Sequence, residues 1–203
     1  LLLHPEAPVD PAAAARARAL AARRAAGEPF AYLAGEREFH GLVFAIGPGV
    51  LVPRPESETM IDAALAHLPP ARTARVLDLG TGSGCLLLAV LHARPNAFGL
   101  GVERSAEALA YAARNRADLG LADRCGLIRA SWLDAVAGRF DLVLANPPYI
   151  PAGEIDALMT DVRDFEPRLA LDGGDDGLAP HRLILAGLAE RLAPGGLALL
   201  EIG

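Results

Sequence analysis

Four consecutive residues, Asn146-Pro147-Pro148-Tyr149, have the side chains needed to hold a planar amide or amine nitrogen. Such a nitrogen is a poor nucleophile because its lone pair is delocalised. The side-chain oxygen of Asn146 can accept one N–H and the carbonyl of Pro147 the other, which favours electron density on nitrogen as charge develops. The prolines preorganise both acceptors, and the ring of Tyr149 can pack on the planar group. This tetrapeptide predicts group transfer to nitrogen, with Asn146, Pro147 and Tyr149 as catalytic residues and all four as substrate-binding residues; the alternative is a proline-rich turn after a strand.

A glycine-rich loop follows an apolar strand earlier in the chain. Three glycines in five residues allow a sharp turn and a close approach of a ligand to the backbone. The spacing G-x-G-x-G is not that of a dinucleotide fold, and no G-K-[ST] sequence of a phosphate loop is present. A ligand without phosphate, such as S-adenosylmethionine, suits this loop, although an ordinary glycine turn is the alternative. We expect the cofactor to contact Asp78, Gly80, Thr81, Gly82, Ser83 and Gly84.

Two further residues fit an adenosine-containing cofactor. Glu103 ends the next strand about 20 positions after the loop, where an acidic side chain can accept both ribose hydroxyls. The alternative for Glu103 is a neighbour of the helix cap at Ser105. Trp132, the single tryptophan, follows the third strand and can pack against adenine or belong to the core.

The elements that position these residues follow from hydrophobic periodicity and from turn residues. Before residue 70 the pattern predicts helices over 12–26 and 57–68, one helical turn within 28–35, and a β-hairpin over 36–46. After it the pattern predicts strands over 74–79, 97–102, 125–130, 140–145 and 197–202, and helices over 84–93, 105–118 and 178–192. Repeated alternation of strands and helices indicates an α/β fold with an open, doubly wound, mostly parallel sheet.

Composition narrows the class further. Hydrophobic residues make up 52% of the 203 residues, so a packed core is expected. No apolar run reaches membrane-spanning length, and the formal net charge of −6 argues against a nucleic-acid partner. Cys85 and Cys125 form neither a disulfide framework nor a metal-binding pair. We expect a cytoplasmic monomer without a metal.

The chain resembles the HemK/PrmC family of protein-glutamine N5-methyltransferases, which are Rossmann-like class I methyltransferases with an N-P-P-Y motif. Beyond that motif, the resemblance rests on residues 28–35, on Val50-Leu51-Val52-Pro53-Arg54-Pro55-Glu56-Ser57-Glu58, and on 165–178. Ser57 stands where the family often has Thr. The resemblance implies S-adenosylmethionine as the methyl donor and S-adenosylhomocysteine as the product. It also implies that Gly80 to Gly84, Glu103, Trp132 and Asn146 contact the cofactor, and that Pro53 and Arg54 border the same pocket.

The resemblance implies that the substrate is the glutamine of the Gly-Gly-Gln tripeptide in peptide chain release factors, whose methylation supports translation termination. N-P-P-Y also serves enzymes that methylate adenine or guanine of nucleic acids or a ribosomal-protein glutamine, and a non-catalytic cofactor-binding module is a further alternative. The implied organisation is the end of a helical substrate-recognition domain at 1–35, a hairpin linker at 36–50, and a methyltransferase domain at 51–203. We expect this last domain to be truncated at its carboxyl end, since strand 197–202 would be an unpaired apolar edge.

Overall fold

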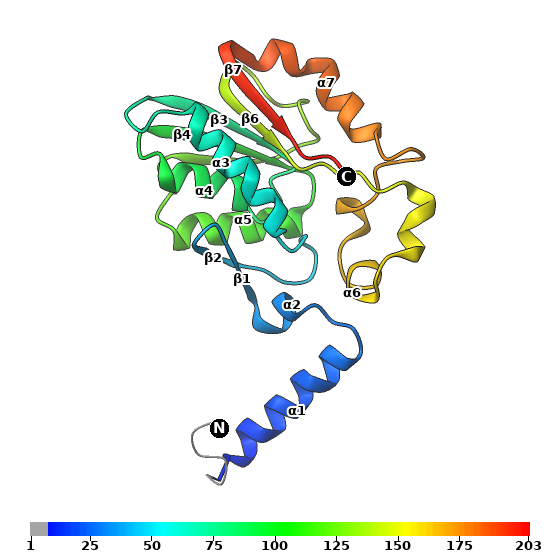
Figure 1. The fold of residues 1–203 in the computed structure, drawn as a ribbon. Helices are drawn as coiled ribbons and strands as arrows, with labels where there is room; N and C mark the ends of the chain where they lie inside the picture. Colours follow the sequence, from blue (N-terminus) through cyan, green and yellow to red (C-terminus); the bar gives the residue numbers. More distant parts are fainter. Residues whose placement is uncertain (1–7) are drawn as a thin grey trace.

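A computed structural model describes residues 8–203, which contain a five-stranded parallel sheet and a separate two-stranded hairpin (Figure 1). The first seven residues of the predicted 1–35 domain lie outside the described part. The helices are α1 (Pro11–Ala25), α2 (Phe30–Ala34), α3 (Glu58–His67), α4 (Cys85–Ala93), α5 (Ala106–Asp118), α6 (Thr160–Arg163) and α7 (Ala179–Arg191). The strands are β1 (Glu36–Phe39), β2 (Leu42–Ala45), β3 (Ala74–Leu79), β4 (Ala97–Glu103), β5 (Cys125–Arg129), β6 (Phe140–Ala145) and β7 (Leu192–Leu200).

The sheet is covered on both faces, as a doubly wound fold requires. Side chains of a strand alternate between faces, so Val76 of β3 packs in one core and the adjacent Leu77 in another. The first core includes apolar residues of α3, α4 and the hairpin, and the second includes Ile184 and Leu188 of α7. Burial on both faces explains why these strands are almost continuously apolar. The predicted fold class is confirmed.

The strand order places the functional loops at one edge of the sheet. The order is β5-β4-β3-β6-β7, and all neighbours are parallel. The chain runs outward from β3 through β4 to β5 and then returns to the other side of β3 with β6. The order therefore reverses between β3 and β6, where an open α/β sheet has its ligand crevice at the carboxyl ends of the strands. Gly80 follows β3 at this point and Asn146 follows β6.

Strand β7 differs from the expected strand over 197–202. It begins at Leu192, which pairs with Phe140, and the register shifts before Leu142 pairs with Leu197. The intervening Pro194-Gly195-Gly196 has the composition of a turn, and the pairing continues past it. The sequence pattern did not predict the short helical turns at Pro55–Ser57, Ala152–Ala157 and Arg168–Ala170, which are held by local hydrogen bonds within connecting segments.

The amino-terminal helices lie away from the sheet, and α1 extends from the body with no buried residue (Figure 1). The Asp10 carboxylate caps α1 by accepting from the backbone N–H of Ala13 at 2.9 Å. No helix within residues 8–203 has the length and apolar character needed to cross a membrane.

The buried side chain of Asn115 joins three parts of the fold. From α5, its amide oxygen accepts from the backbone N–H of Ala45 at 2.7 Å. Its amide nitrogen donates to the carbonyls of Ala45 at 3.2 Å and Ser83 at 2.9 Å. One amide thus ties the hairpin to α5 and to the glycine-rich loop.

We predict that Asn115→Leu lowers the free energy of unfolding by about 3 kcal/mol. The substitution removes all three hydrogen bonds and leaves buried backbone groups without partners, at roughly 1–3 kcal/mol for each group left unpaired. Urea unfolding of wild type and variant measures the change. Arg114→Ala is the control, since its exposed pair with Asp118 on the same helix contributes at most about 0.5 kcal/mol. Equal midpoints for Asn115→Leu and the control would contradict the proposed role.

Candidate active site

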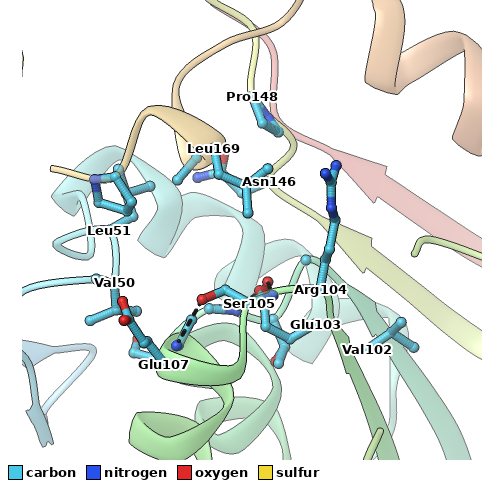
Figure 2. A pocket seen from close by; sticks show the side chains of 18 of the residues that line it. Val50, Leu51, Val102, Glu103, Arg104, Ser105, Glu107, Asn146, Pro148 and Leu169 are labelled. Carbon is cyan, nitrogen blue, oxygen red and sulfur yellow. Dashed lines mark hydrogen bonds between the residues drawn. The ribbon is translucent and has the colours of Figure 1, made fainter. Parts of the chain in front are cut away.

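A cavity of about 400 Å³ lies at the carboxyl ends of β3, β4 and β6. Figure 2 shows Asn146, Pro148 and Leu169 on one side and Glu103, Ser105 and Glu107 on the other. The wall combines the glycine-rich loop, the start of α5, the end of β6 and the turn around Leu169. The volume lies within the usual range for sites that hold a small organic ligand, about 300–1,000 Å³.

The glycine-rich loop makes a turn that other residues adopt poorly. Gly80, Gly82 and Gly84 all have positive φ, at 72°, 56° and 84°. Gly80 and Thr81 donate their N–H groups to the carbonyl of Val102, at 2.9 and 3.0 Å, which fixes the loop to the end of β4. The glycines therefore expose backbone to the cavity, as their spacing predicts.

Glu103 is buried and joins the loop to the next helix. One carboxylate oxygen accepts from the N–H of Gly82 at 2.9 Å, and the other accepts from the N–H of Ser105 at 2.7 Å. A carboxylate offers about four acceptor positions, so these two bonds leave capacity for two hydroxyl donors. Glu103 thus lies in the wall with the acceptors that its predicted contact with a ribose requires.

Trp132 forms another part of the wall. Its backbone has φ 44°, a conformation that costs a residue with a side chain about 1 kcal/mol or more and is often found at functional sites. Its ring edge stands 3.3 Å from the position that a β-carbon on Gly80 would occupy. A side chain at position 80 would therefore crowd the indole, and glycine there keeps the loop and the ring in close contact.

Asn146 contributes an amide whose orientation is fixed by its neighbours. Its nitrogen donates to the hydroxyl of Ser57 at 3.2 Å, and that hydroxyl donates to the Glu201 carboxylate at 2.5 Å. The amide oxygen of Asn146 takes part in neither bond. Asn146 lies in the cavity wall, so this oxygen can accept from a ligand.

The predicted Pro53 and Arg54 also lie in the wall. The Arg54 guanidinium forms an ion pair of 2.8 Å with the Glu166 carboxylate, whose side chain is only 2% exposed. Burial raises the pKa of Glu166, and the charge of Arg54 opposes that shift. The pair joins the proline-rich segment to the residue that precedes the 167–170 turn, which lines the cavity.

Four of the predicted site residues lie outside the cavity wall. Asp78 lies beneath the loop, where its carboxylate accepts from the Thr81 hydroxyl at 2.6 Å. Gly84 is the N-cap of α4, and Pro147 is buried. Tyr149 is half-buried near Glu201 and Gly203. The predicted residues that do line the cavity are Pro53, Arg54, Gly80, Thr81, Gly82, Ser83, Glu103, Trp132, Asn146 and Pro148.

Several residues of the cavity wall were not predicted from the sequence. Val50 and Leu51 precede the Pro53-Arg54 segment, and Leu169 belongs to the 165–178 segment, so the family motifs signalled all three without giving them a role. Arg104 and Glu107 flank the Ser105 cap, and only their proximity to Glu103 in sequence indicated them. Ser57 also lines the cavity and lies within the 50–58 motif, which gave it no role. Glu201, which holds Ser57 from behind the wall, had no local signal.

The residues present suit S-adenosylmethionine. The glycine loop would hold its amino-acid portion, Glu103 its ribose, and Trp132 its adenine. The wall carries the carboxylates of Glu103 and Glu107 and the guanidinium groups of Arg54, Arg104 and Arg168, so both charges of the cofactor's zwitterionic amino-acid portion have possible partners.

Comparisons with known proteins agree with this assignment. A family model described as "Methyltransferase small domain" matches residues 57–163, and one described as "PrmC N-terminal domain" matches residues 1–35. A release factor glutamine methyltransferase of Cereibacter sphaeroides is 49% identical over 203 residues, which cover all of this chain and 72% of the relative. Its counterpart from Bradyrhizobium diazoefficiens is 48% identical over 195 residues, 95% of this chain and 66% of the relative. The chain thus spans about two thirds to three quarters of these relatives.

A solved structure supports the fold. The 16S rRNA N2 G1207 methyltransferase of T. Thermophilus, in complex with AdoMet and guanosine, has a TM-score of 0.59 and 24% identity. The match covers 81% of this chain and 40% of that one.

The fold, the site and these matches together define an S-adenosylmethionine-dependent methyltransferase. Within that class, the chain belongs to the family of release factor glutamine methyltransferases.

Asp78 gives a testable dependence of stability on pH. Burial, followed by the charge of Glu103, raises the pKa of its carboxyl from 3.8 to about 7, although the Thr81 hydroxyl opposes the shift. The folded state therefore holds a proton that the unfolded state releases. Stability from this group is fully present below pH 4 and declines as pH rises toward 7, by up to about 1.4 kcal/mol per pH unit.

We predict that Asp78→Asn removes this decline. The asparagine oxygen can still accept from Thr81, and the amide does not ionise. Urea midpoints between pH 5 and pH 8 test the prediction, since the stability of the variant relative to wild type should increase with pH. Other titrating groups cancel in that difference. Parallel pH profiles would show that Asp78 does not titrate in this range.

Proposed function

We propose that this protein transfers a methyl group from S-adenosylmethionine to the side-chain amide nitrogen (N5) of the glutamine in the Gly-Gly-Gln motif of peptide chain release factors. The single observation that supports this most is the amide of Asn146. Its nitrogen is engaged by Ser57 and its oxygen remains available in the wall of the cofactor cavity. A planar amide with two N–H groups matches that acceptor.

The cofactor, when bound, supplies an electrophilic methyl group on a sulfonium. Asn146 accepts one N–H of the glutamine amide, and the carbonyl of Pro147 accepts the other. Both acceptors favour electron density on the nitrogen as it attacks. The nitrogen becomes strongly acidic once methylated, so it loses a proton without a dedicated base. Pro148 lies in the wall, and the backbone of the tetrapeptide is stiffened by both prolines.

Residues 171–177 pack against the end of the tetrapeptide and fix its position. A β-carbon on Gly177 would lie 2.3 Å from the carbonyl oxygen of Tyr149, so only glycine allows this approach. The N–H of Ile150 donates to the carbonyl of Leu171 at 3.1 Å, and Gly173 donates to Ile150 at 2.8 Å. These contacts fix the backbone that carries the acceptors, which supports a role in orienting a substrate.

Two lines of support favour a protein substrate. The relatives with 42–49% identity are named release factor glutamine methyltransferases. The formal net charge of −6 does not suit the phosphate backbone of a nucleic acid. We also propose a domain division at residues 35 and 50, a monomeric state and a cytoplasmic location. The location follows from a release factor as the substrate.

Methyl transfer to purified substrates tests the assignment. Labelled cofactor is supplied with a release factor, with a ribosomal protein, with DNA and with ribosomal RNA, and mass spectrometry locates any added methyl group. Methyl on the glutamine of Gly-Gly-Gln supports the proposal. A release factor with this glutamine changed to alanine is the control. Label on nucleic acid alone would overturn the proposal.

We predict that Asn146→Ala lowers kcat by about a hundredfold or more, as loss of a preorganised polar group at a reacting centre does. The affinity for S-adenosylhomocysteine should change only a few-fold, since the loop and Glu103 remain. Steady-state kinetics and calorimetry separate the two effects. The control is Asn96→Ala, which removes an exposed asparagine just before β4, at the opposite edge of the sheet. Undiminished turnover by Asn146→Ala would refute the mechanism.

A further inference from the structure

We infer that Ser57 and Glu201 are positioning residues that set the orientation of the Asn146 amide, so that its oxygen rather than its nitrogen faces the substrate. This inference rests on the proposed function, because it concerns the acceptor for the substrate N–H. Ser57 and Glu201 would exert this role through Asn146 and not by contact with the reacting atoms.

The direction of the hydrogen bonds follows from chemistry. An ionised carboxylate has no proton to give, so the Ser57 hydroxyl must donate to Glu201, which it does at 2.5 Å. The hydroxyl has one proton, and this bond uses it. Ser57 can then only accept from Asn146, whose amide nitrogen lies 3.2 Å away. Ser57 is 3% exposed, so water has little access as an alternative partner.

This arrangement decides between two orientations that have almost the same shape. The oxygen and nitrogen of an asparagine amide occupy similar volumes, so packing alone hardly distinguishes them. The reversed amide would place its oxygen against a hydroxyl oxygen whose proton is already committed. It would also present N–H groups to the N–H groups of the substrate. Glu201 therefore acts through Ser57 to make the productive orientation the favoured one.

The backbone of Glu201 is held in place by two neighbouring elements. Its backbone N–H donates to the carbonyl of Ala145 at 3.0 Å, directly before Asn146. Its own carbonyl lies 2.9 Å from the Nε2 of His181, and a carbonyl can only accept, so Nε2 carries the proton. The end of β7 is thus fixed to the end of β6 and to α7, which gives the Ser57–Glu201–Asn146 network a rigid base.

Tyr149 of the tetrapeptide faces the same carboxylate. Burial, and next the negative charge of Glu201, raise the pKa of the Tyr149 hydroxyl, so it stays protonated in the neutral range. The Glu201 carboxylate therefore influences Tyr149 directly and Asn146 through Ser57. The three residues of the network are far apart in sequence, with separations of 89 and 144 positions in the two bonds.

Substitutions at Ser57 that differ in hydrogen bonding test the inference. Ser57→Ala removes the acceptor, and Ser57→Cys keeps a similar size but has a weak sulfur acceptor. Ser57→Thr keeps the hydroxyl and is the matched control. We expect kcat on the release factor to fall about tenfold to a hundredfold in the Ala and Cys variants. The Thr variant should remain within about threefold of wild type.

Two further measurements separate positioning from general damage. The dissociation constant of S-adenosylhomocysteine should stay within about twofold in all three variants, and so should the KM for S-adenosylmethionine. Glu201→Gln should also lower kcat. The neutral amide can donate a hydrogen bond to the Ser57 oxygen, so the Ser57 hydroxyl becomes free to donate to Asn146. The reversed orientation of the Asn146 amide is then no longer disfavoured. A kcat for Ser57→Ala and Ser57→Cys within twofold of wild type would overturn the inference. So would equal losses in the Thr and Ala variants.

The activity of the wild type separates failure of the proposed function from failure of the positioning roles. Wild type that leaves the release factor unmethylated but methylates another substrate refutes the proposed function. The Ser57 series is then measured on that other substrate. Wild type that methylates the release factor with all Ser57 variants equally active refutes only the positioning roles.

Discussion

The parallel pairing of β3 with β6 is the constraint on which the site depends. It aligns Leu79 with Ala145, so the two chains leave the sheet at the same level. The glycine-rich loop follows one strand and Asn146 follows the other. Because the chain reverses its direction of winding between these strands, α4 after β3 and α7 after β6 cover opposite faces of the sheet. The cavity lies at the strand ends between them, and Gly80, Glu103 and Asn146 line it.

The polar groups around this gap are buried, and the fold has to provide their partners. An unpaired buried polar group costs about 1–3 kcal/mol, more than a typical hydrogen bond returns. Asn115 and Glu103 meet this demand by bonding backbone groups of the loop and the adjacent segments. Ser57 and Glu201 meet it for Asn146. The same bonds that satisfy these groups also fix the loops, so stability and preorganisation of the site have a common origin.

Much of the fold was predictable because buried parallel strands are continuous apolar runs and their loops carry glycine and proline. The position of Asn146 beside the cavity followed from the same rule, as did that of Glu103. Asp78, which we predicted to contact the cofactor, points to the face of the sheet that α4 covers, where it accepts from Thr81 beneath the loop. The roles of Ser57 and Glu201 were unpredictable from local sequence, because they arise from contacts across 89 and 144 positions. The start of β7 was missed because a proline-glycine segment interrupts its register.

Acidic side chains lie close to the glycine-rich loop, although the residues of the loop itself are neutral. Glu103 and Glu107 lie in the wall, and Asp78 lies behind the loop with a pKa raised to about 7 by burial and by Glu103. A positive charge in the cavity would oppose that shift, since it favours the ionised carboxylate. An anion there would reinforce the shift and meet repulsion from Glu103. Glu103, which adds to the effect of burial on Asp78, therefore disfavours an anion next to the loop. The loop also lacks the lysine of a phosphate site. Arg54, Arg104 and Arg168 lie elsewhere in the wall, so this preference is local to the loop. Close to the loop, electrostatics and sequence both argue against a phosphate group.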